Sequence, residues 1–247
     1  MRAWAMLVLL AAAPAIRGQE LRRGWVTTVQ SGLAETYQLA LGGVFGQGPS
    51  WQNRVETGIS NVWKQGDYWY VYGADSNDLR SHQDNWLAGL SYRRPVWARG
   101  RQQVVLGGGL QHWKFRSVRD GSNDWLTAES LTYRYSGRVP FTVTSDSYTV
   151  VASRFAKGSL VTTQAWLEHR LSKRESPRIV FRHGPAETYS WGFWGTNGNR
   201  VWRYQSMLSF AWKTTRIEGG LRKQWGMHRG IPDNTLWQFS VSRVIAR

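Results

Sequence analysis

Charged side chains recur at alternate positions along this chain, and most of them are arginines. Rows of guanidinium groups bind passing anions, as charged rings do in anion-selective pores. Set beside carboxylates, the same groups form salt bridges and hold a structure together instead. The candidate cations are Arg54, Arg170, Arg178, Arg182, Arg203, Lys213, Arg216 and Arg222, and the candidate acids are Glu56, Glu168 and Glu218.

The residues that could bind a metal, act as a nucleophile or hold a phosphate lack the spacing that these functions require. The five histidines are scattered, and no two share a strand face beside an acidic ligand. No G-x-S-x-G motif holds a serine as a nucleophile. Gly107-Gly108-Gly109 lacks the lysine and the helix of a phosphate loop. We expect these glycines to lie inside a strand, where they relieve crowding at a bend of the barrel. We therefore expect no catalytic residue, no metal site and no cofactor.

The charged residues need strands to position them, and the clearest strand pattern is the segment from Arg203 to Lys213, RYQSMLSFAWK. Its residues alternate between an apolar, aromatic face and a mostly polar face with a cation at each end, which is typical of a β-strand. A soluble β-sandwich buries the apolar face, whereas a membrane barrel turns it to lipid. In a barrel, the outer or girdle residues would include Trp202, Tyr204, Leu208, Phe210, Trp212, Trp237 and Phe239.

Export and composition favour the barrel over the sandwich. Residues 1–18 have the layout of a secretory signal peptide, with Arg2 followed by an apolar run over residues 7–13. Residues 19–247 then form one domain. The chain has 16 Trp, yet its mean hydropathy is −0.47. Aromatic girdles around a polar lumen produce that mixture, and no stretch approaches the ~20 apolar residues of a transmembrane helix.

Turn signals divide the chain into about twelve strands. Short and long connections alternate, as in outer-membrane barrels, although the connection at 94–101 is predicted to be loose. We therefore predict an all-β fold: a single antiparallel transmembrane β-barrel. Two segments fit poorly, because Glu129 shares a face with Leu131 and Tyr133, and because residues 144–147 would need a bulge or a change of register. The predicted strands are 34–46, 51–64, 67–75, 85–96, 102–115, 124–136, 141–155, 159–171, 177–189, 200–213, 215–226 and 234–245.

The C-terminal part of the chain contains the segments TQAWLEHRL, RIVFRHGPAETYSW, RYQSMLSFAW, GLRKQWGM and TLWQFSVSR, in that order. In these segments it resembles the YaiO-like outer-membrane β-barrel family. The resemblance implies an outer-membrane barrel without a catalytic motif, with a role in the envelope or near polysaccharide. A second resemblance is to narrow twelve-stranded porins for acidic oligosaccharides, whose lumens carry arginine tracks.

We expect a non-catalytic barrel of the bacterial outer membrane with a structural or polysaccharide-associated role. A narrow anion-selective porin for acidic oligosaccharides is the alternative, and an outer-membrane lipid-modifying hydrolase is the third. The net charge of +16 suits outer-membrane lipid, lipopolysaccharide and acidic polysaccharide as partners, with the barrel-assembly machinery for insertion. Export argues against nucleic acid. Inside the barrel we expect a salt-bridged plug rather than an anion ladder, because twelve strands leave little free bore.

Overall fold

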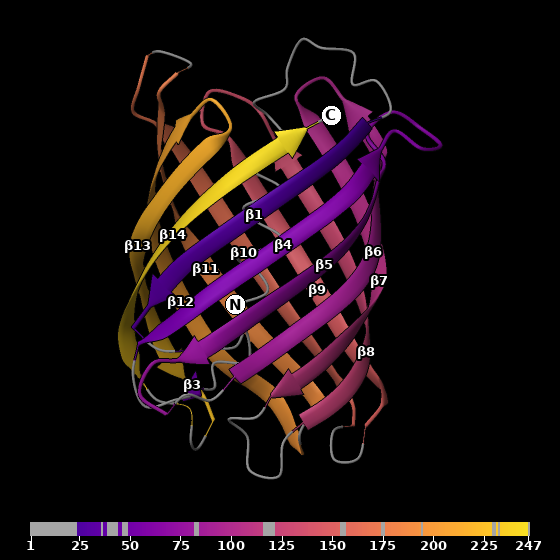
Figure 1. Cartoon of the computed structure of the whole chain (residues 1–247), viewed down its shortest axis with the longest axis vertical. Coiled ribbons are helices and arrows are strands. Elements are labelled where there is room, and N and C mark those ends of the chain that lie inside the picture. The colour runs from indigo at the N-terminus through magenta and orange to yellow at the C-terminus, as the bar shows by residue number, and fades with distance from the viewer. Residues whose placement is uncertain are drawn as a thin grey trace.

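Twelve antiparallel strands close into one barrel in the computed structural model (Figure 1). The structure describes residues 24–35, 37–38, 44–45, 49–81, 84–115, 122–153, 157–173, 176–193, 195–228, 231 and 233–246, so the predicted signal peptide lies outside the described residues. The predicted all-β barrel is confirmed. Its strands are β1 (Gly24–Ala34), β4 (Ser50–Ser60), β5 (Tyr68–Asp78), β6 (Asp84–Arg99), β7 (Gln102–Phe115), β8 (Ser122–Tyr135), β9 (Phe141–Ala152), β10 (Ser159–Arg170), β11 (Arg178–Phe193), β12 (Thr196–Trp212), β13 (Thr215–Gly226) and β14 (Asn234–Ala246).

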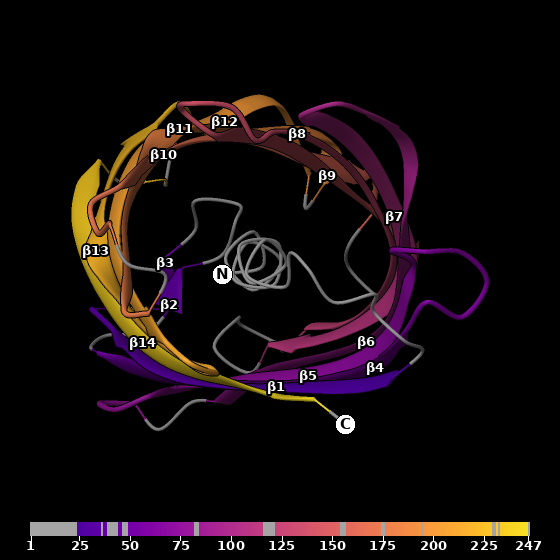
Figure 2. The same cartoon turned by 90° about the horizontal axis from the view of Figure 1, so that it is seen from above.

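The first predicted strand, at 34–46, is wrong. The first barrel strand is β1, which pairs with β4 on one side and with β14 on the other. Its outward face mixes hydroxyl residues such as Thr27 and Ser31 with apolar ones, so its alternation is weak in the sequence. Among the described residues of 34–46, Ala34 ends β1, and the others include the short strands β2 (Tyr37–Gln38) and β3 (Val44–Phe45), which pair with each other and lie inside the ring of barrel strands (Figure 2).

The connections alternate between the two ends of the barrel. At one end, the turn rim, two-residue turns such as Gly100-Arg101 and Lys213-Thr214 occur beside the longer connections 61–67 and 171–177. The other end, the loop rim, carries the longest connection, 35–49, but also the two-residue connection 194–195, so the predicted contrast between short turns and long loops is only partial. The predicted loose connection at 94–101 is instead paired strand as far as Arg99 and Gln102. A register shift at Pro95 accommodates a residue that cannot donate to the ladder.

Side chains alternate between the inside and the outside of this wall. On β12, Leu208 is 51% exposed, while its neighbours Met207 and Ser209 are 1% and 3% exposed. Large exposed apolar side chains cover the outside, with aromatic residues gathered toward each rim, as in membrane barrels. Toward the loop rim these are Trp51, Trp125, Trp202 and Trp225, and toward the turn rim they are Trp25, Phe210 and Trp212. Among the described residues, no helix is long and apolar enough to cross a membrane.

The bulge predicted at residues 144–147 is absent. Strand β9 pairs with β10 through this region without a register shift, and the irregularity between β8 and β9 falls at Trp125 instead. Asp146 is buried on the inner face, while Ser145 and Ser147 point outward. The strand therefore keeps its alternation by placing hydroxyl groups on the outer surface.

Candidate functional site in the barrel interior

Most of the predicted charged residues lie on the inner face of the barrel. The buried ones are Arg182, Arg203, Arg222, Glu56 and Glu218, and the half-buried ones are Arg54, Arg178, Arg216 and Glu168. They come from different strands because every second residue of each strand faces the interior. The predicted outer residues Trp202, Tyr204, Leu208, Phe210, Trp212, Trp237 and Phe239 are all exposed on the other face.

Two predicted interior cations lie elsewhere. Lys213 is wrong as a lumen residue, because β12 ends at Trp212 and Lys213 occupies the following turn with a φ of 51°. Its side chain is exposed, and its Nζ lies 5.0 Å from the centre of the Trp212 ring. Arg170 is the last residue of β10, exposed at the turn rim, and its Nε donates to the Ser172 carbonyl at 2.9 Å.

Three charged side chains form a buried cluster on the wall of β11 to β13. Glu218 accepts hydrogen bonds through Oε1 from Arg182 and from Arg216, the latter at 3.2 Å. The Arg182 guanidinium also lies 5.2 Å from the centre of the Trp166 ring, within cation–π range. One carboxylate thus offsets part of the charge of two cations, and this part of the wall is held by salt bridges.

A second ion pair lies on β4. The Arg54 Nη2 donates to Glu56 Oε2 at 2.9 Å, and the guanidinium covers the Tyr72 ring at 4.3 Å. Arg54 and Glu56 are two residues apart, so they share the inner face. In this pair and in the cluster around Glu218, an acid lies beside an interior cation.

Arginines nearer the loop rim have different surroundings. Arg203 donates to the Thr188 hydroxyl at 3.0 Å, and no carboxylate of the described residues lies within salt-bridge distance of it. Arg203 pairs in register with Gln224, two residues beyond Arg222 on β13, so the two arginines are diagonal neighbours. Their like charges repel each other. Arg200, toward the loop rim on the same strand as Arg203, donates to the Thr196 hydroxyl.

Sequence reasoning missed a column of tyrosines on β5. Tyr68, Tyr70 and Tyr72 are buried on the inner face, and Arg93 of β6 lies 4.8 Å from the ring centre of Tyr68. Arg134 of β8 lies within electrostatic reach of Arg93 and of Glu168. The alternating segment YWYVY at 68–72 carried the signal for this column.

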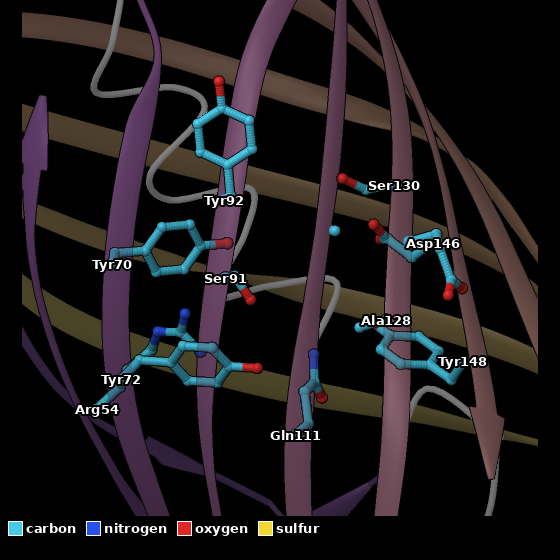
Figure 3. Close-up of a pocket in the computed structure, with 12 residues that line it drawn as sticks. Arg54, Tyr70, Tyr72, Ser91, Tyr92, Gln111, Ala128, Ser130, Asp146 and Tyr148 are labelled. Atoms are coloured by element: carbon cyan, nitrogen blue, oxygen red, sulfur yellow. The ribbon is translucent and has the colours of Figure 1, made fainter. Parts of the chain in front are cut away.

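The tyrosine column borders a pocket in the inner wall (Figure 3). Figure 3 shows Tyr70, Tyr72 and Arg54 on one side of it, and Asp146 and Tyr148 on the other. Tyrosine hydroxyl, amide, carboxylate and guanidinium groups thus meet at this small pocket, and they can both donate and accept hydrogen bonds. Strand β5 lies six strands from β11 in either direction round the barrel, so the column faces the wall that carries Arg182.

The described histidines do not form a metal centre. His169 and His183 approach each other at 3.0 Å between their Nε2 atoms, and His183 Nδ1 lies 2.6 Å from the Tyr204 hydroxyl. All three side chains lie on the outer face. No group of three or more His, Cys, Asp or Glu side chains that could hold a metal occurs in the described part of the chain.

Known structures are similar to this barrel at low sequence identity. The NanC porin matches with a TM-score of 0.58 at 7% identity, over 90% of this chain and 99% of that chain. CdiB from Acinetobacter baumannii matches at 10% identity with a TM-score of 0.48, over 92% of this chain and 61% of that chain. The beta domain of the Bordetella autotransporter BrkA matches at 11% identity with a TM-score of 0.48, over 89% of this chain and 97% of that chain.

Comparisons of the sequence find no match. No protein-family model matches the chain, and no curated protein matches it, so the resemblance to the YaiO-like family stays a prediction. The NanC match exceeds a TM-score of 0.5 and carries the fold alone. Together with the apolar outer surface and its two aromatic zones, it places the chain among the outer-membrane β-barrels.

Proposed function

We propose that this barrel is a narrow outer-membrane channel for anionic solutes rich in hydroxyl groups, such as acidic oligosaccharides. The observation that carries the proposal is the pair Arg203 and Arg222, two adjacent buried arginines of like charge on the inner face. Two neighbouring guanidinium groups on the inner face attract a passing anion, as they do in anion pores lined with arginine.

The distribution of charge along the interior supports this function. The longest connection between barrel strands, 35–49, lies at the loop rim, and long loops are extracellular in outer-membrane barrels, so we orient the loop rim to the outside. An entering anion would meet Arg200, Arg203 and Arg222 before the salt-bridged cluster around Glu218. The pocket beside the tyrosine column then offers hydroxyl, amide and carboxylate groups that hydrogen-bond to a sugar. The NanC protein, which has the same fold, is named a porin.

The width of the barrel is also in keeping with a narrow pore. Barrels of eight strands are filled by their own side chains, whereas those of sixteen or more leave an aqueous channel. Twelve strands lie between these limits. Long arginine and tyrosine side chains on facing walls narrow the passage further, which favours selection of solutes over free diffusion.

Conductance in planar bilayers tests the proposal. The unmodified barrel should conduct and prefer anions, and Arg203→Gln combined with Arg222→Gln should abolish the preference while current remains. The matched control removes two cations from the outer face, Lys223→Gln with Arg243→Gln, and should leave selectivity unchanged. A current without anion preference would contradict an anion channel, and a preference that survives the interior substitutions would contradict the role of Arg203 and Arg222.

A non-catalytic structural wall is the second candidate. The ion pairs that Glu218 forms with Arg182 and Arg216 favour this candidate, because a salt-bridged plug would contain pairs of this kind. Neither the channel nor the structural wall gives the described histidines a catalytic role. His112 bonds to Asn123, His169 and His183 bond to each other, His183 also bonds to Tyr204, and His228 bonds to a backbone carbonyl. Negligible conductance of correctly folded barrel in the same experiment would favour this wall over the channel.

A further inference from the structure

Five polar residues form a continuous area on the outer face of β8 to β11, here termed the outer polar patch: Glu129, Ser145, Ser147, Thr163 and Glu187. They are neighbours across the strands, because Glu129 pairs in register with Ser147, Ser145 with Thr163, and Thr163 with Glu187. Both segments that fitted a membrane strand poorly in the sequence therefore meet in one place.

The outer polar patch lies between the two aromatic zones. Glu129 is six residues from Tyr135 at the turn rim of β8 and four residues from Trp125 toward the loop rim. At this depth lipid offers no hydrogen-bond partner, and a charged side chain there is destabilising. The Glu129 side chain is exposed and has no hydrogen bond or ion pair with any described residue.

A second polar stretch on the outer face shows the contrast. On β1, β4 and β5, Ser31 donates to the Asn53 side chain at 2.6 Å, and Asn53 donates to Asp75 at 3.2 Å. These groups satisfy one another within the wall. In the outer polar patch, Ser145 and Thr163 share a hydrogen bond at 3.2 Å and Asn199 donates to Glu187 at 2.5 Å, but Glu129 is left without a partner.

Hydrogen-bonding groups of opposite character lie beside the patch. His183 of β11 bonds to His169 of β10 and to Tyr204 of β12, and all three face outward. His183 is five residues from Arg178, the turn-rim end of β11, and Glu129 is six residues from the same rim. The acid and the imidazole therefore lie at similar depths on the two sides of β9 and β10.

We propose that the outer polar patch is the contact surface between two copies of this barrel lying side by side in the membrane. Two copies inserted in the same direction are related by a two-fold axis parallel to the barrel axis, which keeps depth and exchanges the two sides of the contact. With the axis at β9 and β10, Glu129 of each copy meets His183 of the other, and its carboxylate replaces His169 as the partner of the His183 Nε2. Ser145 and Thr163 lie near the axis, where hydroxyl groups both donate and accept and so fit their own counterparts.

Disulfide crosslinking tests the contact directly, because the chain contains no cysteine. Thr163→Cys should form a covalent dimer when outer membranes are oxidised. The control is Val55→Cys, exposed on the outer face of β4, which lies opposite β10 with five strands between them on either side. We expect at least about tenfold more dimer from Thr163→Cys. Equal yields from two correctly folded variants would overturn the proposal, as would crosslinking of Thr163→Cys to a different membrane protein.

A charge exchange tests the partner residues. Glu129→His and His183→Glu should each lower the dimer fraction in mild detergent, measured as the native mass, because like groups then face each other. The double variant should restore it. Retention of heat-modifiable migration identifies the folded barrels in each case. A monomeric mass for the unmodified protein, or a double variant no better than either single one, would overturn the proposal. The dimer contact is independent of conductance, so its failure leaves the channel proposal standing.

Discussion

Arg182 and Glu218 are joined across β12, with Arg182 on β11 and Glu218 on β13. Met207 lies between them on β12, in register with Arg182 on one side and with Gly220 on the other. The space beside Gly220 is taken by the Met207 side chain, and the long arginine side chain crosses the intervening strand to reach the carboxylate. A pair of this kind ties strands that share no backbone hydrogen bonds.

Arg182→Gln should lower the free energy of unfolding by roughly 3–5 kcal/mol, because it leaves Glu218 buried with a single partner. The control Arg170→Gln removes an exposed cation at the turn rim and should cost less than about 1 kcal/mol. Urea titration of the refolded barrel in lipid vesicles measures both. Equal stability of the two variants would show that the buried cluster does not hold the wall.

Leu208→Arg should cost roughly 2–4 kcal/mol, because it places a cation on the lipid side between the aromatic zones. Ser209→Arg should be much milder, since Ser209 faces inward and pairs in register with Glu218. The two changes differ by one position in the chain and introduce the same side chain. Equal losses in the same titration would contradict the assignment of inner and outer faces.

Gly109→Ala should destabilise the barrel, whereas Gly108→Ala should be close to neutral. A Cβ at Gly109 would collide with the Leu90 carbonyl and the Ser91 side chain on the adjacent strand, while at Gly108 the nearest atom lies 4.0 Å away. The collision forces a backbone shift that typically costs about 1–3 kcal/mol. Thermal unfolding followed by gel mobility separates the two variants, and a neutral Gly109→Ala would contradict the close approach of β6 and β7.

Lys213→Val should lower the stability by about 1–3 kcal/mol, because a β-branched residue tolerates a positive φ poorly. Lys213→Asn should be nearly neutral, since asparagine adopts this conformation more readily. Both variants lose the same charge, so the difference between their unfolding free energies isolates the backbone. Equal values would mean that the turn relaxes to another conformation.

The alternation of apolar and polar residues was sufficient to predict the barrel, its strand number and the orientation of residues such as Leu208 and Arg222. It failed at β1, where hydroxyl residues on the outer face weaken the pattern. It also failed at Lys213, because alternation alone does not say where a strand gives way to its turn. The ion pair of Arg182 with Glu218 depends on strand register across β12, which spacing along one segment does not contain.

The pairing of β1 with β14 brings Val26 beside Ala246, so the wall has a seam between segments from opposite ends of the domain. The Trp237 amide also donates to the Glu35 carboxylate across it. Closing this seam requires ordering nearly the whole chain. The conformational entropy of loop closure is therefore lost before the last row of hydrogen bonds forms and compensates for that loss. A chain shortened by its final strand would therefore expose two unpaired edges, on β1 and β13. The barrel would then not close at all, although only one of its twelve strands is missing.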